Sequence, residues 1–377
     1  MSKKVIFLGN TCNYAFEYHQ FFQQKGIISK AIIDYNGINR DFPSWHNPDF
    51  YQTKNIHLVN NTIPFSIPRK IISLKLDKEN TVFHCFGIMS CIWPFILNYK
   101  FIYHGYGDIL TTPKNPEKNL KGYIRRFLSK KILAKAKFVL VSQSTDIPEL
   151  KKFPEISKRK LRYVNLYQKI QTTHVKEDLF HENEKVIFIP TRHEDFKNTH
   201  LFLKLLIIQI RERSLNPSQI KIITIRWGSG FKKVLDLIHE EKMEEYFLIK
   251  PLMKKKEFLG IMKSADIIVN EFTEFSDIPS FFGGISREAA MMGKPLITQI
   301  NSSYMELFYS QKPPIDIISN YSDLESVINK FLNFSKDNLD KIGTDLINWY
   351  DQEYNPEKIF LETNQIHDEV LYPRPTD

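Results

Sequence analysis

The sequence has few of the features that are typical of secreted proteins, membrane-spanning proteins or proteins stabilised by a structural zinc ion. Its three cysteines, Cys12, Cys85 and Cys91, are too few and too irregularly spaced for a disulfide framework or a four-cysteine zinc site. Such sparse cysteine is typical of a reducing, cytosolic setting. The longest mostly apolar stretch, 86–97, is shorter than the ~20 residues that cross a bilayer and contains Pro94, so we expect it to be buried core.

Targeting signals and repeats are also missing. The opening MSKKVIFLGN carries two lysines, but its apolar run stops after Leu8 and no small-residue cleavage site comes after it, so it does not have the pattern of a signal peptide. There is no low-complexity stretch and no internal repeat. Apolar residues make up 42% of the chain and charged residues 25%, which excludes a mainly disordered, collagenous or coiled-coil protein.

Charge is distributed unevenly along the chain. Residues 1–180 hold 28 Lys and Arg against 13 Asp and Glu, whereas the remaining residues hold 24 against 30. A chain of 377 residues, at roughly 150 per domain, is expected to form two or three domains. A basic first half joined to a mildly acidic second half therefore indicates two domains with different partners.

The densest basic segment, 114–137, has apolar residues at helical spacing, which predicts an amphipathic helix. Its basic side chains include Arg125, Arg126, Lys130 and Lys131. Two interpretations stay open. Such a helix lies on an anionic membrane surface, or it packs its apolar stripe on its own domain and leaves the charges in solvent. Nucleic acid is disfavoured because no recognition motif accompanies the charge.

Short β-branched and aromatic runs alternate with helical stretches in both halves. In the first half, the candidate strands are 4–10, 28–36, 81–87, 100–107, 137–144 and 161–167. A helical stretch comes after the first of these strands. After the polar segment 171–185, the candidate strands are 186–192, 220–226, 246–253, 266–272 and 295–300, and the candidate helices are 200–214, 232–242, 254–265 and 284–294. This order predicts an α/β protein with two parallel sheets, each with crossover helices, and ligands at the carboxyl ends of the strands.

A candidate phosphate site lies just before the predicted helix 284–294. Gly283 and Gly284 let the backbone approach a phosphate, and the helix N-terminus offers free N–H groups and a positive dipole end. Glu288, one turn into the helix, is placed to accept hydrogen bonds from a ribose diol. Taken alone, these features are weak evidence, because Gly-Gly before a helix is more often a plain turn and Glu is a common helix residue.

The same segment resembles a signature of type B glycosyltransferases, in particular the retaining, nucleotide-sugar-dependent class (glycosyl transferases group 1, family 4-like). That signature runs Glu, an aromatic residue, Gly, then Glu-Ala-Met and Gly-Lys-Pro. Here Phe282-Gly283, 288–291 and 293–295 match in order and spacing. The resemblance implies that Glu288 binds the donor ribose and that Gly283 and Gly284 face its diphosphate.

One position departs from the signature. The family has a first Glu eight positions before the second, and Ser280 stands there. Asp277 and Glu274 are the nearby carboxylates that would compensate for it. We therefore include Ser280 and Asp277 among the candidate donor-site residues.

Two further segments resemble the family. In 187–198, a strand ends in Arg192 and Lys197 comes five residues later, which implies two cations on the diphosphate. Fixed cations would stabilise the leaving diphosphate. The alternative is a loop with surface charges.

The segment 101–110 resembles the family's strand that leads into His-Gly-x-x-Asp. This implies that His104 lies near the reacting sugar carbon and that Asp108 meets the acceptor or the sugar. The alternatives are a satisfied buried histidine and a cap or turn residue, respectively. His84, at another strand end, is a lesser candidate.

The resemblance, over about residues 1–345, implies two Rossmann-like domains that face each other across a cleft, the GT-B fold. Residues 1–170 would hold the acceptor, 171–185 would link the domains, 186–345 would bind the nucleotide sugar, and 346–377 would form helix that packs back toward the N-terminal domain. The expected reaction is transfer of a sugar to an acceptor hydroxyl with retention. No metal cofactor is expected, because no Asp-x-Asp pair is present.

The basic first half favours a glycan or lipid-linked acceptor at an anionic surface, in surface polysaccharide or glycolipid assembly. The expected location is cytoplasmic, peripheral on the inner face of the membrane. Two other functions stay open. One is a sugar-nucleotide epimerase or phosphorylase on the same fold. The other is a non-catalytic sugar- or nucleotide-binding partner of a glycosyltransferase complex. Ser280 supports this alternative, because it replaces the first Glu of the signature.

Overall fold

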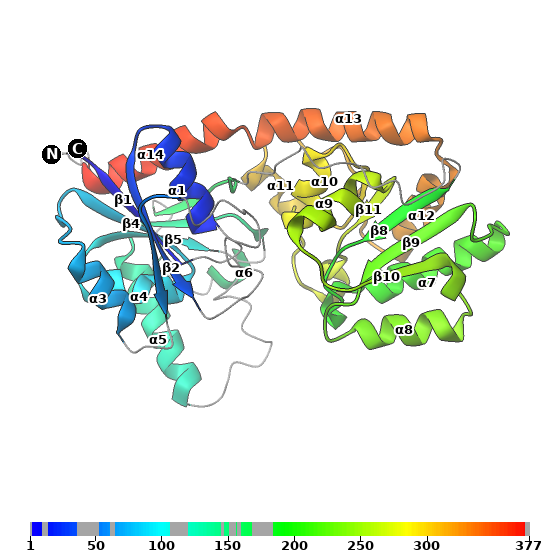
Figure 1. The fold of residues 1–377 in the computed structure, drawn as a ribbon, viewed down its shortest axis with the longest axis horizontal. Helices are drawn as coiled ribbons and strands as arrows, with labels where there is room; N and C mark the ends of the chain where they lie inside the picture. The colour runs from blue at the N-terminus through cyan, green and yellow to red at the C-terminus, as the bar shows by residue number, and fades with distance from the viewer. Residues whose placement is uncertain are drawn as a thin grey trace. The chain divides into compact units, whose positions relative to one another are not determined.

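The computed structural model describes residues 2–9, 14–35, 53–60, 65–105, 120–144, 147–150, 156, 160–167 and 184–373. The chain divides into two compact units (Figure 1). Unit 1 contains Met1–Lys169 and Tyr354–Asp377, and unit 2 contains Ile170–Glu353. The boundary expected at 345–346 falls inside helix α13 (Lys336–Glu353), and the chain passes from unit 2 to unit 1 at the end of that helix instead.

Unit 1 is built on a seven-stranded sheet of order β3-β2-β1-β4-β5-β6-β7, with every neighbouring pair parallel. Its strands are β1 (Lys4–Leu8), β2 (Ile28–Tyr35), β3 (Ile56–Asn60), β4 (Thr81–Phe86), β5 (Lys100–Gly105), β6 (Phe138–Val141) and β7 (Leu161–Tyr163). The sequence predicted all of them except β3. That strand lies at the edge of the sheet and only Val59 is buried, so it has little of the apolar patterning by which strands are recognised.

The central strands of unit 1 are apolar because they are covered on both faces. Every residue of β4 is buried. The helices of this unit are α1 (Tyr14–Gln24), α3 (Ser66–Ser73), α4 (Ile88–Ile96), α5 (Leu120–Lys135), α6 (Ile147–Leu150) and α14 (Pro356–Leu371). Helix α14 begins at a side-chain cap, in which Asn355 accepts hydrogen bonds from the N–H groups of Glu357 (2.9 Å) and Lys358 (3.2 Å).

The apolar stretch 86–97 is not wholly buried, so that expectation is wrong. Most of it forms α4, which buries Ile88, Cys91 and Pro94 on one face. On the other face Met89 is 61% exposed and Ile96 is 58% exposed. A surface helix can bury only one stripe, even when its sequence is apolar all round.

Unit 2 is built on a five-stranded parallel sheet of order β10-β9-β8-β11-β12. Its strands are β8 (Lys185–Ile189), β9 (Ile220–Ile225), β10 (Phe247–Lys250), β11 (Ile267–Val269) and β12 (Leu296–Ile297). Its helices are α7 (Thr199–Glu212), α8 (Phe231–Glu240), α9 (Lys255–Ser264), α10 (Gly284–Met291), α11 (Ser302–Phe308), α12 (Tyr321–Asn333) and α13, with 3₁₀ turns η4 (Asp195–Lys197), η5 (Glu244–Tyr246) and η6 (Thr273–Ser276). Every strand and helix predicted between 186 and 300 is present, although several strands are shorter than expected.

The strand order of unit 2 decides where a ligand can bind. The chain starts on β8, places β9 and β10 on one side, and then returns to place β11 and β12 on the other. The connection that leaves β8 therefore leads to one side of the sheet and the connection that leaves β11 leads to the other, so the carboxyl ends of these neighbouring strands form the switch point where open α/β sheets bind ligands.

Helix α13 packs directly against the segment that follows α10. A Cβ atom built on Gly343 of α13 would lie 1.9 Å from the carbonyl oxygen of Gly293, just after α10. The two backbones therefore touch, and only glycine fits. Nearby, the rings of Phe282 and Trp349 meet edge to face at 4.9 Å. Among the described residues, no helix is both long and apolar enough to span a membrane.

Candidate functional site

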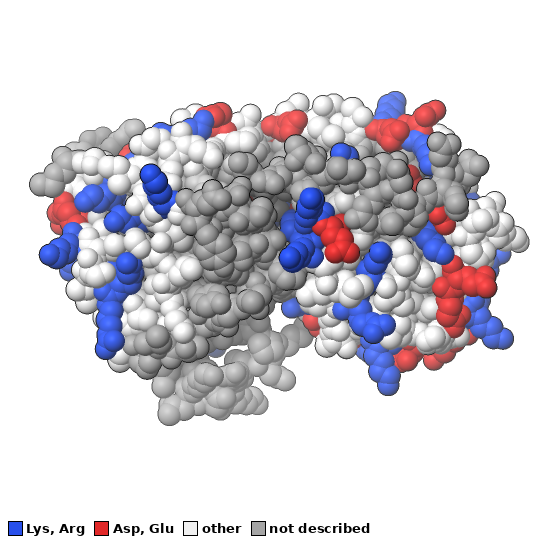
Figure 2. Space-filling model, in the orientation of Figure 1, with Lys and Arg blue, Asp and Glu red and all other residues white. Residues whose placement is uncertain are grey.

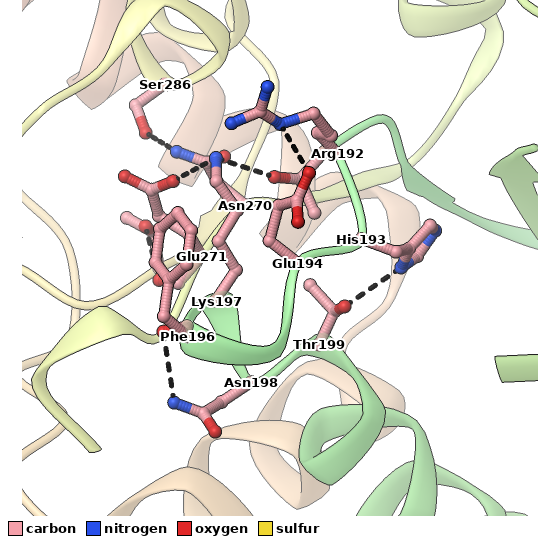
Figure 3. Close-up of polar contacts among 12 residues, drawn as sticks. Arg192, His193, Glu194, Phe196, Lys197, Asn198, Thr199, Asn270, Glu271 and Ser286 are labelled. Atoms are coloured by element: carbon pink, nitrogen blue, oxygen red, sulfur yellow. Dashed lines mark hydrogen bonds and ion pairs between the residues drawn. The ribbon is translucent and has the colours of Figure 1, made fainter. Parts of the chain in front are cut away.

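Two loops of unit 2 meet at the carboxyl ends of β8 and β11 (Figure 3). Lys197, from the first loop, forms an ion pair with Glu271, from the second, and both side chains are largely buried. The backbones are joined as well, because the N–H of Phe272 donates to the carbonyl oxygen of Lys197 at 3.0 Å. Asn198 completes the junction when its Nδ2 donates to the carbonyl of Phe272 (3.0 Å) and to Ser276 Oγ (2.9 Å).

A buried histidine fixes the shape of the first loop. His193 contacts Thr199 Oγ1 through Nδ1 at 2.9 Å (Figure 3). Its Nε2 contacts Thr224 Oγ1 at 2.7 Å. Burial, reinforced by the charge of Lys197, lowers the pKa of His193 to about 4. The ring is therefore neutral at pH 7. Its role is to connect the loop to Thr199 and Thr224 by hydrogen bonds, and it adds no charge to the site.

The same loop requires a glycine opposite it. Gly228 has φ +107°, and a Cβ there would lie 2.2 Å from the carbonyl oxygen of His193. The N–H of Gly230 donates to that oxygen at 2.8 Å. The turn after β9 thus supports the loop that carries the two candidate cations.

Arg192 lies on this loop and keeps part of its surface in solvent. Its Nε lies 3.1 Å from Glu194 Oε1, and its side chain is 38% exposed. Its guanidinium also lies 5.9 Å from the centroid of the Trp227 ring. Arg192 and Lys197 therefore stand on one loop, each with a carboxylate partner.

The N-terminus of α10 lies beside the second loop. Nδ2 of Asn270 donates to Ser286 Oγ, in the first turn of α10, at 2.9 Å, and the Asn270 Nδ2 is 3.9 Å from where a Cβ of Gly283 would stand. A Cβ on Gly284 would meet nothing within 4 Å. Open space therefore lies over Gly284, where the first N–H groups of a helix lack intrahelical acceptors.

Glu288 is buried and paired one turn further along α10. Its carboxylate forms an ion pair with Lys255, at the start of α9. The ammonium of Lys255 also lies 5.0 Å from the centroid of the Phe258 ring. Glu288 is thus a fixed acceptor at the carboxyl edge of the sheet.

Glu274 occupies the neighbourhood of Ser280. Oε1 of Glu274 accepts hydrogen bonds from the hydroxyl of Ser280 at 2.9 Å and from its N–H at 3.3 Å. Asp277 is exposed and ends η6 in the left-handed region with φ 56°. The carboxylate of Glu274 is therefore held against the serine.

His104 lies in unit 1, fully buried at the end of β5. Its Nδ1 lies 2.8 Å from His84 Nε2, and its Nε2 lies 2.6 Å from Ser142 Oγ. Burial lowers its pKa to about 3, so the ring is neutral at pH 7. Asp108 lies outside the described residues.

Known proteins match this chain in structure but not in sequence. No protein-family model and no curated protein sequence matches the chain. Among solved structures, HepE from Anabaena in complex with UDP-glucose aligns over 97% of this chain and 99% of its own, with a TM-score of 0.65 and 14% identity. The pneumococcal O-GlcNAc transferase GtfA in complex with UDP and GlcNAc aligns over 98% and 99%, with a TM-score of 0.65 and 10% identity. A glycosyltransferase from Rickettsia africae aligns over 99% and 100%, with a TM-score of 0.64 and 15% identity.

The chain has the fold of a type B glycosyltransferase. In this glycosyltransferase fold, the structure brings Arg192, Lys197, Gly283, Gly284 and Glu288 to the carboxyl edge of one sheet. Their roles remain predictions. Within the described ranges, no three His, Cys, Asp or Glu side chains are grouped so as to hold a metal ion.

Three residues that lie at this edge were not named in the sequence analysis. Asn270 and Glu271 come directly after β11, so their place at a strand's carboxyl end was a usable signal. Lys255 had no such signal, because nothing in the sequence links the start of α9 to Glu288 in α10. Arg192, Lys197 and Lys255 each have a carboxylate partner, so the site is close to charge balance.

Proposed function

We propose that this protein is a glycosyltransferase that moves a sugar from a nucleotide-diphosphate sugar to an acceptor hydroxyl. The observation that carries the proposal is the meeting of the Arg192–Lys197 loop with the β11–α10 loop at the switch point of unit 2. The structural neighbours HepE and GtfA, solved with UDP-glucose and with UDP, support it.

The proposed donor lies along the edge of the second sheet. The first N–H groups of α10, next to the open space at Gly284, face the diphosphate. Arg192 and Lys197 stabilise its charge as it leaves. Glu288 accepts from the ribose hydroxyls, and Glu274, held on Ser280, supplies the carboxylate that position 280 lacks.

The proposed reaction proceeds with retention and without a metal. The acceptor oxygen bonds to the anomeric carbon on the face that the diphosphate leaves, and a departing phosphate oxygen takes the acceptor's proton. This leaves no need for a separate base. The role of the protein is to hold both substrates and to neutralise the developing charge.

A thermal-shift screen against UDP-, GDP-, ADP- and CMP-linked sugars, without added metal, tests the donor site. One nucleotide class is expected to raise Tm, because a ligand that binds only the folded state stabilises it. Glu288→Gln is expected to reduce that shift, whereas the exposed Glu240→Gln is a control that keeps it. No shift with any nucleotide sugar would contradict the proposal.

Turnover tests the two cations separately from folding. Arg192→Ala with Lys197→Ala is expected to lower turnover about 100-fold or more, as loss of charge-stabilising groups does elsewhere. Loss of Lys197 leaves the buried Glu271 without its ion-pair partner, so cooperative urea unfolding of the variant is confirmed before its turnover is measured. Turnover near that of the wild type would show that neither cation stabilises the leaving diphosphate.

We further propose that the acceptor lies at an anionic membrane surface, as in polysaccharide or glycolipid assembly on the cytoplasmic face. Figure 2 shows mostly Lys and Arg among the charged side chains drawn on unit 1, and both signs on unit 2. On α5, Ile132 and Leu133 are buried in unit 1, whereas Phe127 is 60% exposed beside the exposed Arg126. The helix therefore serves its own core and still offers an aromatic side chain among basic ones.

Vesicle binding tests this surface. Neutralising Arg125, Arg126, Lys130 and Lys131 together is expected to reduce binding to vesicles that contain phosphatidylglycerol, with little effect on neutral vesicles. The side chain of Arg125 lies outside the described ones. A matched control neutralises the Lys and Arg of α8 and α9 that stand outside the site, Lys232, Lys233, Lys256 and Lys263. Equal binding by both variants would return α5 to a structural role.

A further inference from the structure

Three buried histidines of unit 1 form one continuous hydrogen-bonded chain. His367 Nε2 of α14 lies 3.0 Å from His84 Nδ1 of β4, and His84 Nε2 lies 2.8 Å from His104 Nδ1 of β5. His104 Nε2 then lies 2.6 Å from Ser142 Oγ, directly after β6. Aromatic rings, among them Phe7, surround the chain.

All three rings are neutral at pH 7. Burial lowers the pKa of His104 and of His367 to about 3 and that of His84 well below its usual value. A neutral imidazole carries one N–H and one bare nitrogen. The chain therefore has only two arrangements, in which every ring donates toward Ser142 or every ring donates toward His367.

The far end of the chain decides between them. Nδ1 of His367 is buried and has no hydrogen-bond partner. If the rings donated toward His367, this nitrogen would carry an unpaired buried N–H. Donation toward Ser142 places a lone pair there instead, so that no ring N–H of the chain is left without an acceptor.

The near end of the chain is the one that a ligand can reach. Ser142 is half-buried at the carboxyl end of β6, the edge at which parallel sheets bind ligands, and its hydroxyl contacts only His104 among the described residues. When Ser142 Oγ accepts from His104 Nε2, its own proton is free to donate outward. The hydroxyl is thereby oriented as a donor.

We propose that Ser142 binds the glycosyl acceptor by donating a hydrogen bond to one of its sugar hydroxyl oxygens, and that His104, His84 and His367 are positioning residues that orient this donor. That the bound sugar is the glycosyl acceptor rests on the proposed function. The chain holds no charge, so it fits an uncharged polyol oxygen rather than a phosphate. No proton is transferred in this role.

The direction of the chain is tested in the wild-type protein. With ¹⁵N-labelled histidine, two-bond proton–nitrogen correlation spectra at pH 7 report which nitrogen of each ring carries the proton. We expect Nε2–H and bare Nδ1 for His84, His104 and His367. An Nδ1–H at His104 would overturn the proposal, because the Ser142 proton would then be directed to His104.

Recognition is tested with octyl glycosides of glucose, galactose and N-acetylglucosamine as probes. At least one is expected to shift the His104 Nε2 resonance saturably in the wild type and in Ser142→Thr, which keeps the hydroxyl. Ser142→Ala is expected to bind that glycoside about tenfold more weakly, the value of one hydrogen bond. Absence of a shift with all three, or equal binding by Ser142→Ala, would overturn the proposal.

UDP binding, measured in the same samples, separates this proposal from the proposed function. A protein that binds no UDP-sugar but shows the glycoside shift rejects the donor site and leaves Ser142 as a sugar contact. A protein that binds UDP but shows no shift rejects the role of Ser142 alone.

Discussion

Acidification is expected to destabilise unit 1 through its buried histidine chain. His84, His104 and His367 are neutral in the folded protein because burial lowers the pKa of each, to about 3 for the last two. In the unfolded chain these rings titrate near 6.5. The unfolded state therefore binds more protons below that pH, and the free energy of unfolding falls as pH falls from about 6.5 toward 3.

The size of the effect comes from the same pKa values. Each lowered unit is worth 1.36 kcal/mol, so lowering pH from 7 to 5 removes about 2 kcal/mol for each of His104 and His367, about 4 kcal/mol together, and His84 acts in the same direction. That is comparable with the whole stability of many domains, about 5–15 kcal/mol. Unit 1 is thus expected to unfold, or to release α14, in mild acid.

Hydrogen exchange in denaturant, measured on peptides from β4 and β5, reports this stability locally. His367→Phe removes one titrating ring and is expected to lessen the loss between pH 7 and 5 by about 2 kcal/mol. Val370→Ala, at another buried position of α14, is the matched control, since it lowers stability equally at both pH values. If His367→Phe retained the full wild-type pH dependence, the reasoning from buried neutral rings would be refuted.

Three further predictions concern unit 2. Gly343→Ala is expected to cost about 3 kcal/mol or more, because its Cβ would lie 1.9 Å from the Gly293 carbonyl oxygen, and urea unfolding that matches the wild type would contradict the close contact of the helices. Lys185→Met is expected to lower the free energy of unfolding by about 2 kcal/mol in the same assay, since Nζ of Lys185 donates to three carbonyls at the end of α12, at 3.2, 2.6 and 2.8 Å. An unchanged urea midpoint would mean that water fully replaces the ammonium group at these carbonyls. Glu271→Gln is expected to lower stability and to tighten UDP binding severalfold in calorimetry, because Lys197 loses its anionic partner; weaker binding would indicate that Glu271 holds the lysine in position rather than competing with the diphosphate.

The amino-acid pattern was sufficient for the α/β class and for nearly every strand. The runs at β1, β4 and β8 are almost wholly buried, so they are mostly apolar and easily recognised. Edge strand β3 lacks that pattern. Apolar content was a poor guide at α4, where a helix with few polar residues still exposes Met89 and Ile96.

The candidate site was predicted only in part, because a sequence shows which residues come after a strand but not which residues lie opposite it. Arg192 and Lys197 could be named from their place after β8, and Glu288 from its place in α10. Their partners come from distant parts of the chain. Lys197 meets Glu271 because β8 and β11 are neighbours, and Glu288 meets Lys255 because α9 and α10 begin at the same edge.

The sequence by itself therefore determined the local structure, the two-unit architecture and the residue types at the strand ends. Local propensity and apolar periodicity act within a few residues of each other, so they can be read along the chain. Only the tertiary structure decided that Glu274 lies on Ser280 and that His367 reaches His84 across 283 positions of sequence. Those pairings depend on strand order and helix packing, which bring together side chains that no local pattern connects.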